Sequence, residues 1–150
     1  MSTYTQILYQ IVFSTKHREK TILESREEEL YRYIWGVLND KKCVLYQVGG
    51  VSDHIHIVTH LHPSVALADV VKDIKMSTSS FIKENQLFPH FDGWQNGYGA
   101  FTYNIEAKEN LINYVKRQKA HHQRQSLNFR KEYKELLEEH HIEYDEKYLL

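Results

Sequence analysis

Two kinds of hydrophobic pattern alternate along this chain, and their order leaves few folds open. Four short stretches rich in β-branched and aromatic residues have the composition of strands, whereas the stretches between and after them place apolar residues at helical spacing. The expected strands are 4–14, 43–48, 53–61 and 98–103; the expected helices begin at Ser25 and at Pro63-Ser64, and two more cover about 105–122 and 127–140. The order β-α-β-β-α-β-α-α predicts an α+β fold of the ferredoxin-like (RRM-like) type, an antiparallel sheet with two helices on one face and additional C-terminal helices.

Three local features refine this expectation. Residues 4–14 are apolar on both faces of a strand, which predicts a central position in the sheet. Gly49-Gly50 interrupts an apolar run and predicts a turn or a bulge. Asn104 is expected to cap the helix 105–122 that follows it.

Length and composition are typical of one intracellular domain. A chain of 150 residues can bury a substantial core as a single domain, 1–150. No apolar run approaches the roughly 18 residues of a membrane span, and the N-terminal segment lacks the basic and apolar regions of a signal peptide. One cysteine, Cys43, excludes an internal disulfide framework and a zinc site built from several cysteines. We therefore expect a cytoplasmic protein without a membrane partner.

The charges nearly cancel over the chain but are segregated along it. A formal net charge of −1 excludes a global positive field, so any nucleic-acid site must be a local patch. Residues 108–131 contain seven Lys or Arg and one acid, whereas residues 132–147 contain seven acids and two lysines. A basic helix suits phosphate binding, although a solvated helix face has the same composition.

His54-Ile55-His56 is the first group of residues that can carry chemistry. On a strand, residues two apart point to the same face, so both imidazoles project together while Ile55 points into a core. Two neighbouring imidazoles can chelate a divalent ion that takes further ligands from elsewhere. The alternative interpretation is a pair of surface histidines on a half-exposed strand.

Tyr114 and Gln118 form the second group. They are four residues apart on an expected helix and therefore share one face, with His121 and His122 one turn further on. An amide oxygen is an acceptable ligand for a hard divalent ion, and a tyrosine hydroxyl can act as a covalent nucleophile. A tyrosine at such a position also occurs simply as core packing. The sequence contains no phosphate-binding glycine loop and no G-x-S-x-G nucleophile motif.

Five separated motifs, in this order, extend over nearly the whole chain and make its sequence similar to one known family. The chain resembles the HUH single-tyrosine transposases of small bacterial insertion sequences (transposase A, insertion sequence 200/605 type). The motifs are Val12-Phe13-Ser14-Thr15-Lys16, Gly49-Gly50-Val51-x-Asp53-His54-x-His56, Trp94-Gln95-x-Gly97-Tyr98-Gly99-Ala100-Phe101, Tyr114-x-x-x-Gln118-x-x-His121-His122 and Ile142-Glu143-Tyr144-Asp145-x-x-Tyr148.

The resemblance implies a metal-dependent DNA strand transferase. It implies that His54, His56 and Gln118 bind Mg²⁺ or Mn²⁺, and that Tyr114 attacks the scissile phosphate to form a 5′-phosphotyrosine and a free 3′-OH. It further implies single-stranded DNA with hairpins at the element ends as substrate, and a homodimer whose active sites are assembled within one subunit or shared between two.

Basic side chains are expected to hold the DNA phosphates. The candidates are Lys16, Arg18, Lys72, Lys75, Lys116, Arg117 and Lys119. Two alternatives to the transposase remain open at this point. One is a non-catalytic, domesticated or decayed protein of the same fold that only binds single-stranded nucleic acid; the other is a histidine-rich metalloenzyme that acts on small molecules and does not need Tyr114.

Overall fold

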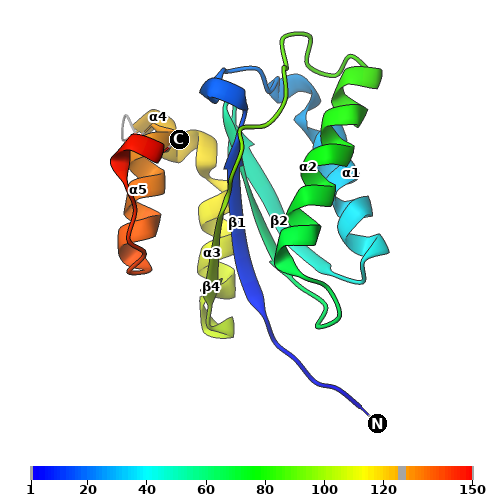
Figure 1. The fold of residues 1–150 in the computed structure, drawn as a ribbon, viewed down its shortest axis with the longest axis vertical. Coiled ribbons are helices and arrows are strands. Elements are labelled where there is room, and N and C mark those ends of the chain that lie inside the picture. The colour runs from blue at the N-terminus through cyan, green and yellow to red at the C-terminus, as the bar shows by residue number, and fades with distance from the viewer. Residues whose placement is uncertain (1, 125–127, 150) are drawn as a thin grey trace.

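Four antiparallel strands form the sheet of this computed structural model, which describes residues 2–124 and 128–149 (Figure 1). The strands are β1 (Leu8–Ser14), β2 (Val44–Val51), β3 (His54–His60) and β4 (Gly99–Tyr103), in the spatial order β2-β3-β1-β4. The helices are α1 (Glu27–Asp40), α2 (Leu67–Glu84), α3 (Lys108–Lys116), α4 (Gln118–Arg124) and α5 (Phe129–Glu139). The predicted ferredoxin-like order is confirmed, and β1 is central as expected.

The first face of the sheet packs against α1 and α2 (Figure 1). Alternate residues of β1 and β3 point to this face and are fully buried there against both helices. They pack with the apolar stripes of the helices; the central members are Ile11, Phe13, Ile55, Ile57, Leu30, Ile34, Val70 and Ile74. Each such side chain contributes about 1.5–3 kcal/mol by leaving water, so this layer is the main core.

The second face is covered by the C-terminal helices (Figure 1). Leu111 and Val115 of α3 pack on Val58 of β3 and on the start of β1. α5 packs on the other half of this face, with Phe101 of β4 among its buried contacts. The additional helices thus form a third layer, and the residues of β3 that alternate with Ile55 and Ile57 lie between the sheet and this layer.

Three local expectations are wrong. Gly49-Gly50 forms neither a turn nor a bulge; both glycines lie inside β2, where Gly49 pairs with His56, and the register shift of this strand is between Leu45 and Gln47. The helix expected over 105–122 is interrupted: a short 3-10 turn (Ile105–Ala107) precedes α3, and Arg117 separates α3 from α4. The side chain of Asn104 makes no capping hydrogen bond.

The last helix begins at a genuine cap. Residue 127, where the sequence pattern starts this helix, lies outside the described residues. The side chain of Asn128 accepts a hydrogen bond from the backbone N–H of Lys131 at 2.8 Å, which satisfies one of the free donors of the first turn of α5. Among the described residues, no helix is both long and apolar enough to cross a bilayer.

Candidate functional site

The two histidines of β3 lie on the sheet face that α3 and α5 cover, and both are completely buried. Nδ1 of His54 is 2.7 Å from Asp53 Oδ1. Nδ1 of His56 is 2.6 Å from Gln10 Oε1, and the Gln10 amide in turn donates to the Tyr103 hydroxyl. Because these acceptors hold the Nδ1 side of each ring, both Nε2 atoms are directed to the same point above the sheet.

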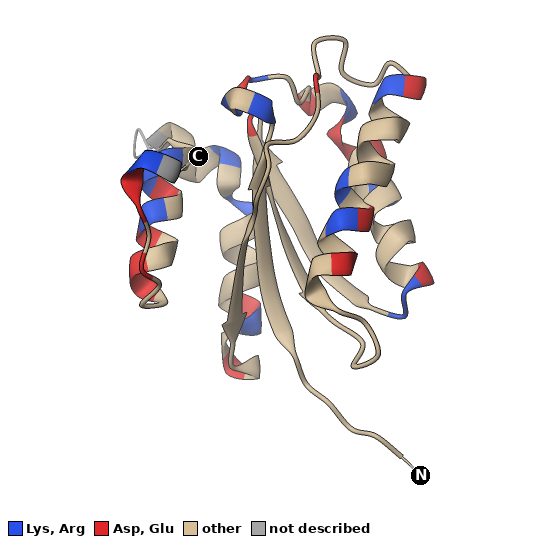
Figure 2. Cartoon of the chain, in the orientation of Figure 1, with Lys and Arg blue, Asp and Glu red and all other residues tan. Residues whose placement is uncertain are grey.

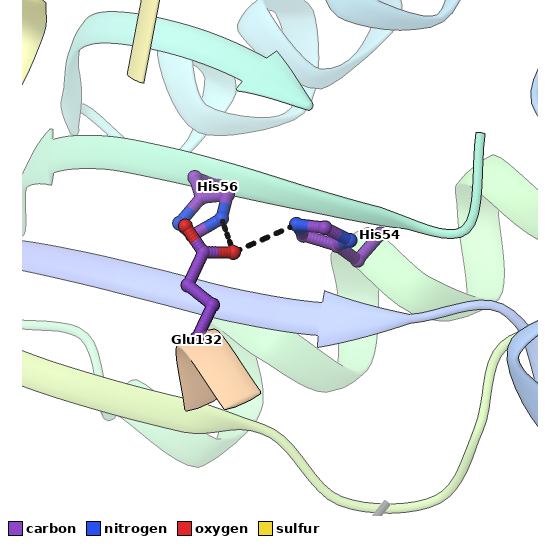
Figure 3. A group of neighbouring side chains, drawn as sticks. All are labelled: His54, His56 and Glu132. Carbon is purple, nitrogen blue, oxygen red and sulfur yellow. Dashed lines mark hydrogen bonds and ion pairs between the residues drawn. The ribbon is translucent and has the colours of Figure 1, made fainter. Parts of the chain in front are cut away.

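Glu132 occupies that point, although it comes from α5 (Figure 3). Its Oε1 is 3.0 Å from His54 Nε2 and 3.2 Å from His56 Nε2. His122 of α4 approaches the same oxygen, with its Nε2 at 3.0 Å. One ligand atom from each of His54, His56 and Glu132 lies within 4.8 Å of the others, so this buried group could hold a metal ion.

Gln118 and Tyr114 complete the cluster. Gln118 Oε1 is 3.3 Å from His54 Nε2, and its amide nitrogen donates to Glu132 Oε2 at 2.9 Å. The Tyr114 hydroxyl donates to the same Oε2. Despite the break at Arg117, all four predicted site residues therefore meet in one chain, and each of them contacts the Glu132 carboxylate.

The electrostatics of the cluster follow from burial and from this shared carboxylate. Burial alone would lower the pKa of His54, but its hydrogen bonds to Asp53 and Glu132 raise it to about 9. Complete burial lowers the pKa of His56. Burial opposes ionisation of Glu132, yet the surrounding histidines hold its pKa well below the usual range. Burial and the Glu132 charge raise the pKa of Tyr114, which keeps this hydroxyl protonated in the ion-free protein.

The donor set suits a divalent cation. Imidazole nitrogens are common ligands of transition metals, and amide and carboxylate oxygens are accepted by Mg²⁺ and Mn²⁺ as well. A tyrosine hydroxyl can act as a nucleophile, and the one of Tyr114 lies on the carboxylate of a group that could hold a Lewis-acidic ion. Such an arrangement can transfer a phosphoryl group to tyrosine.

Two cavities of about 380 Å³ each are lined in part by residues of the cluster. The first lies on the side of Asp53 and His122 and is also lined by Lys20 and Lys119. The second opens onto Tyr114 and is lined by several acidic side chains of α5, among them Glu135. His122 thus borders the first cavity, whereas Tyr114 and Glu132 border the second.

Lys and Arg are spread over several helices and loops, interspersed with Asp and Glu (Figure 2). The predicted DNA-contacting residues among them differ in exposure. Five of them are exposed at the surface: Lys16, Arg18, Lys72, Lys116 and Arg117. Lys75 is instead engaged internally, because its ammonium donates to the backbone oxygens of Gln95 and Gly97 at 2.7 and 2.6 Å. Lys119 is held by the Glu27 carboxylate at 2.7 Å.

Sequence reasoning missed Glu132 as part of the site. It lies in the acid-rich segment 132–147, which by charge alone resembles a solvated tail. A signal was nevertheless present, because Glu132 is three residues after Phe129 and four before Leu136 and so falls within the apolar stripe of the helix. A carboxylate at such a position needs buried partners.

Comparisons with known proteins give a family match and matches to solved structures of the same fold. The family model described as IS200-like transposase matches residues 3–118. A crystal structure of a candidate transposase from Deinococcus radiodurans R1 aligns with a TM-score of 0.62 and 17% identity, covering 79% of this chain and 95% of that one. A REP-associated tyrosine transposase bound to a REP hairpin aligns with a TM-score of 0.61 and 15% identity, covering 81% and 74%. Both likenesses show a shared fold; the comparison with curated sequences gives no significant match.

Proposed function

This chain belongs to the IS200-like transposase family, whose members are DNA-transfer enzymes, and we propose that it cleaves and rejoins single-stranded DNA with Tyr114 as the nucleophile. One observation carries this proposal. The Tyr114 hydroxyl, the Gln118 amide and the two imidazoles of β3 converge on a single buried carboxylate within one chain. A protein that only binds DNA has no need of this combination.

The proposed metal ligands are His54, His56 and Gln118, and the proposed ion is Mg²⁺ or Mn²⁺. When bound, the ion supplies Lewis-acid polarisation of the scissile phosphate and offsets the charge that develops there. Asp53 and Gln10 fix the orientation of the two imidazoles, and the buried position of the rings excludes bulk water.

In the proposed reaction, the Tyr114 oxygen forms a bond to phosphorus while the bond from phosphorus to the 3′-oxygen breaks. The tyrosine proton is lost, and the departing 3′-oxygen takes up a proton. The products are a 5′-phosphotyrosine and a free 3′-OH. Because the phosphodiester is exchanged and not hydrolysed, a 3′-OH can reverse the step and rejoin strands without a nucleotide cofactor.

The proposed substrate is single-stranded DNA with hairpins near the element ends. One structural relative of this chain was solved bound to a hairpin, which supports hairpin recognition in a protein of this fold. The exposed basic residues Lys16, Arg18 and Lys72 could contact phosphates of such a hairpin. We further propose a cytoplasmic homodimer, since an element has two ends and each chain supplies one Tyr114.

A covalent-adduct assay tests the proposal. The protein is mixed with Mn²⁺ and single-stranded oligonucleotides copied from the DNA flanking its gene, and is then run on a denaturing gel beside Tyr114→Phe. We expect a shifted band with the wild type alone. Hairpin binding without any adduct would instead support a non-catalytic binding protein, and an adduct formed by Tyr114→Phe would exclude Tyr114 as the nucleophile.

A further inference from the structure

We propose that Glu132 and His122 are themselves ligands of the metal ion, so that the ion is held by α4 and α5 as well as by β3. Both residues lie beyond residues 3–118, the part of the chain that the family model matches. The family match therefore assigns neither of them. The inference takes the ion from the proposed function but concerns only how this chain binds it.

The distances within the cluster are those of ligands around one ion. In an octahedral site with bonds of about 2.1 Å, adjacent ligand atoms lie about 3.0 Å apart. Glu132 Oε1 lies 3.0, 3.2 and 3.0 Å from the Nε2 atoms of His54, His56 and His122. Gln118 Oε1 lies 3.3 Å from His54 Nε2 and 3.1 Å from His122 Nε2. Each of these five pairs thus has the spacing of adjacent corners of one coordination shell.

A neutral His56 ring cannot satisfy both of its neighbours by hydrogen bonding alone. Gln10 Oε1 accepts from His56, so the proton of a neutral His56 ring is on Nδ1. Its Nε2 then has a lone pair and faces Glu132 Oε1, an acceptor, at 3.2 Å. The other tautomer would satisfy Glu132 but leave Nδ1 facing an acceptor at 2.6 Å. A cation among these atoms removes the conflict, because every lone pair then points at positive charge.

Burial adds to the argument. The side chains of His54 and Glu132 are 0% and 1% exposed, and that of His122 is 11% exposed. A carboxylate so far from water is stable only with strong charge compensation. A divalent ion provides it, and Glu132 then also reduces the net charge of the loaded site.

Glu132 would also link the ion to the nucleophile. Its Oε1 faces the imidazoles, while its Oε2 accepts from the Tyr114 hydroxyl and the Gln118 amide. α5 would therefore set the position of the nucleophile relative to the ion.

Calorimetric titration with Mn²⁺ alone, without DNA, tests the inference. We expect the wild type to bind one Mn²⁺ per chain and Glu132→Gln to bind it at least about tenfold more weakly, because loss of even an outer-shell partner commonly costs that much. The matched control is Glu135→Gln, an exposed carboxylate on the same helix, which should bind like the wild type.

His122→Ala gives a second, independent test in case Glu132→Gln does not fold. It should weaken Mn²⁺ binding, whereas His121→Ala, which changes the neighbouring histidine, should not. Unchanged Mn²⁺ affinity in a folded Glu132→Gln or in His122→Ala, or no Mn²⁺ binding by the wild type, would overturn the inference. If Mn²⁺ affinity depends on Glu132 and His122 as expected but no DNA adduct forms, the inference stands and the proposed function is rejected.

Discussion

Gly49 of β2 lies directly beneath Val115 of α3, so closely that a Cβ on Gly49 would be 2.3 Å from the Val115 carbonyl oxygen. Gly49 is also the strand partner of His56. This contact sets how near α3 approaches the sheet, and it brings the Tyr114 ring to a centroid distance of 5.8 Å from His56. The glycine therefore matters for the geometry of the site as well as for packing.

Gly49→Ala should displace α3, because the atom that the new methyl group meets is backbone and cannot rotate away. We expect a loss of about 1–3 kcal/mol in the free energy of unfolding, as for other overpacked sites, and a marked loss of DNA adduct. Thermal denaturation and the gel assay measure the two effects.

Gly36→Ala is the matched control for this substitution. A Cβ at Gly36, inside α1, would meet nothing within 4 Å. Alanine also has the higher helix propensity, so this variant should gain up to about 1 kcal/mol in stability and keep its activity. Equal behaviour of the two variants would reject a special role for the contact between Gly49 and Val115.

His56→Ala should abolish DNA cleavage while changing hairpin affinity only slightly. The imidazole belongs to the proposed metal site and is completely buried, so it cannot contact a hairpin on the surface. Adduct formation and fluorescence-anisotropy binding to the same hairpin oligonucleotide separate the two effects. A variant that still cleaved DNA would remove His56 from the proposed ligand set.

Gln10→Leu tests whether the hydrogen bond from His56 to Gln10 orients this proposed metal ligand. Gln10 is fully buried and holds His56 Nδ1 at 2.6 Å, so its loss frees the ring to rotate and to change tautomer. We expect Mn²⁺ affinity to fall by about 10–100-fold. Mn²⁺ titration checks this, and wild-type affinity in the variant would show that Gln10 does not orient the ligand.

Lys72 and Lys75, both on α2, should behave differently when changed to alanine. Lys72 is exposed, so Lys72→Ala should change stability by no more than about 0.5 kcal/mol. If Lys72 contacts a phosphate, this variant should also lower the slope of log affinity against log salt for a hairpin by about 1.

Lys75→Ala should instead destabilise the fold by about 1.5–3 kcal/mol, because the Lys75 ammonium holds two backbone oxygens of the loop that leads to β4. Urea denaturation and salt-dependent binding distinguish the two lysines. If Lys75→Ala lowered the salt dependence of hairpin binding without a loss of stability, and Lys72→Ala did not, Lys75 and not Lys72 would be the residue that contacts DNA.

The fold could be predicted from sequence because its signals are local. Stretches rich in β-branched and aromatic residues mark the four strands, and Ile55 and Ile57 alternate with the histidines so regularly that the two faces of β3 are specified. The interruption at Arg117 could not be predicted in this way. The helical spacing continues from Tyr114 to Gln118 and His122, and only tertiary packing decides that the helix is broken at Arg117.

The site could be predicted only in part. His54 with His56, and Tyr114 with Gln118, are each close in sequence, so their spacing indicates a shared face. Glu132 is distant in sequence from both pairs, and its place among them depends on how α5 packs on the second face of the sheet. Tertiary contacts of this kind leave only an indirect trace in the sequence, here a charged residue within an apolar stripe.

Mass-spectrometric mapping of the DNA adduct tests the central claim most directly. Trypsin releases residues 109–116 as one peptide, and Tyr114 is its only tyrosine. After nuclease and trypsin digestion of the purified adduct, we predict that this peptide carries a nucleotide through a 5′-phosphate on Tyr114. A nucleotide found on any of the other ten tyrosines of the chain, or an adduct with no phosphotyrosine, would contradict the account.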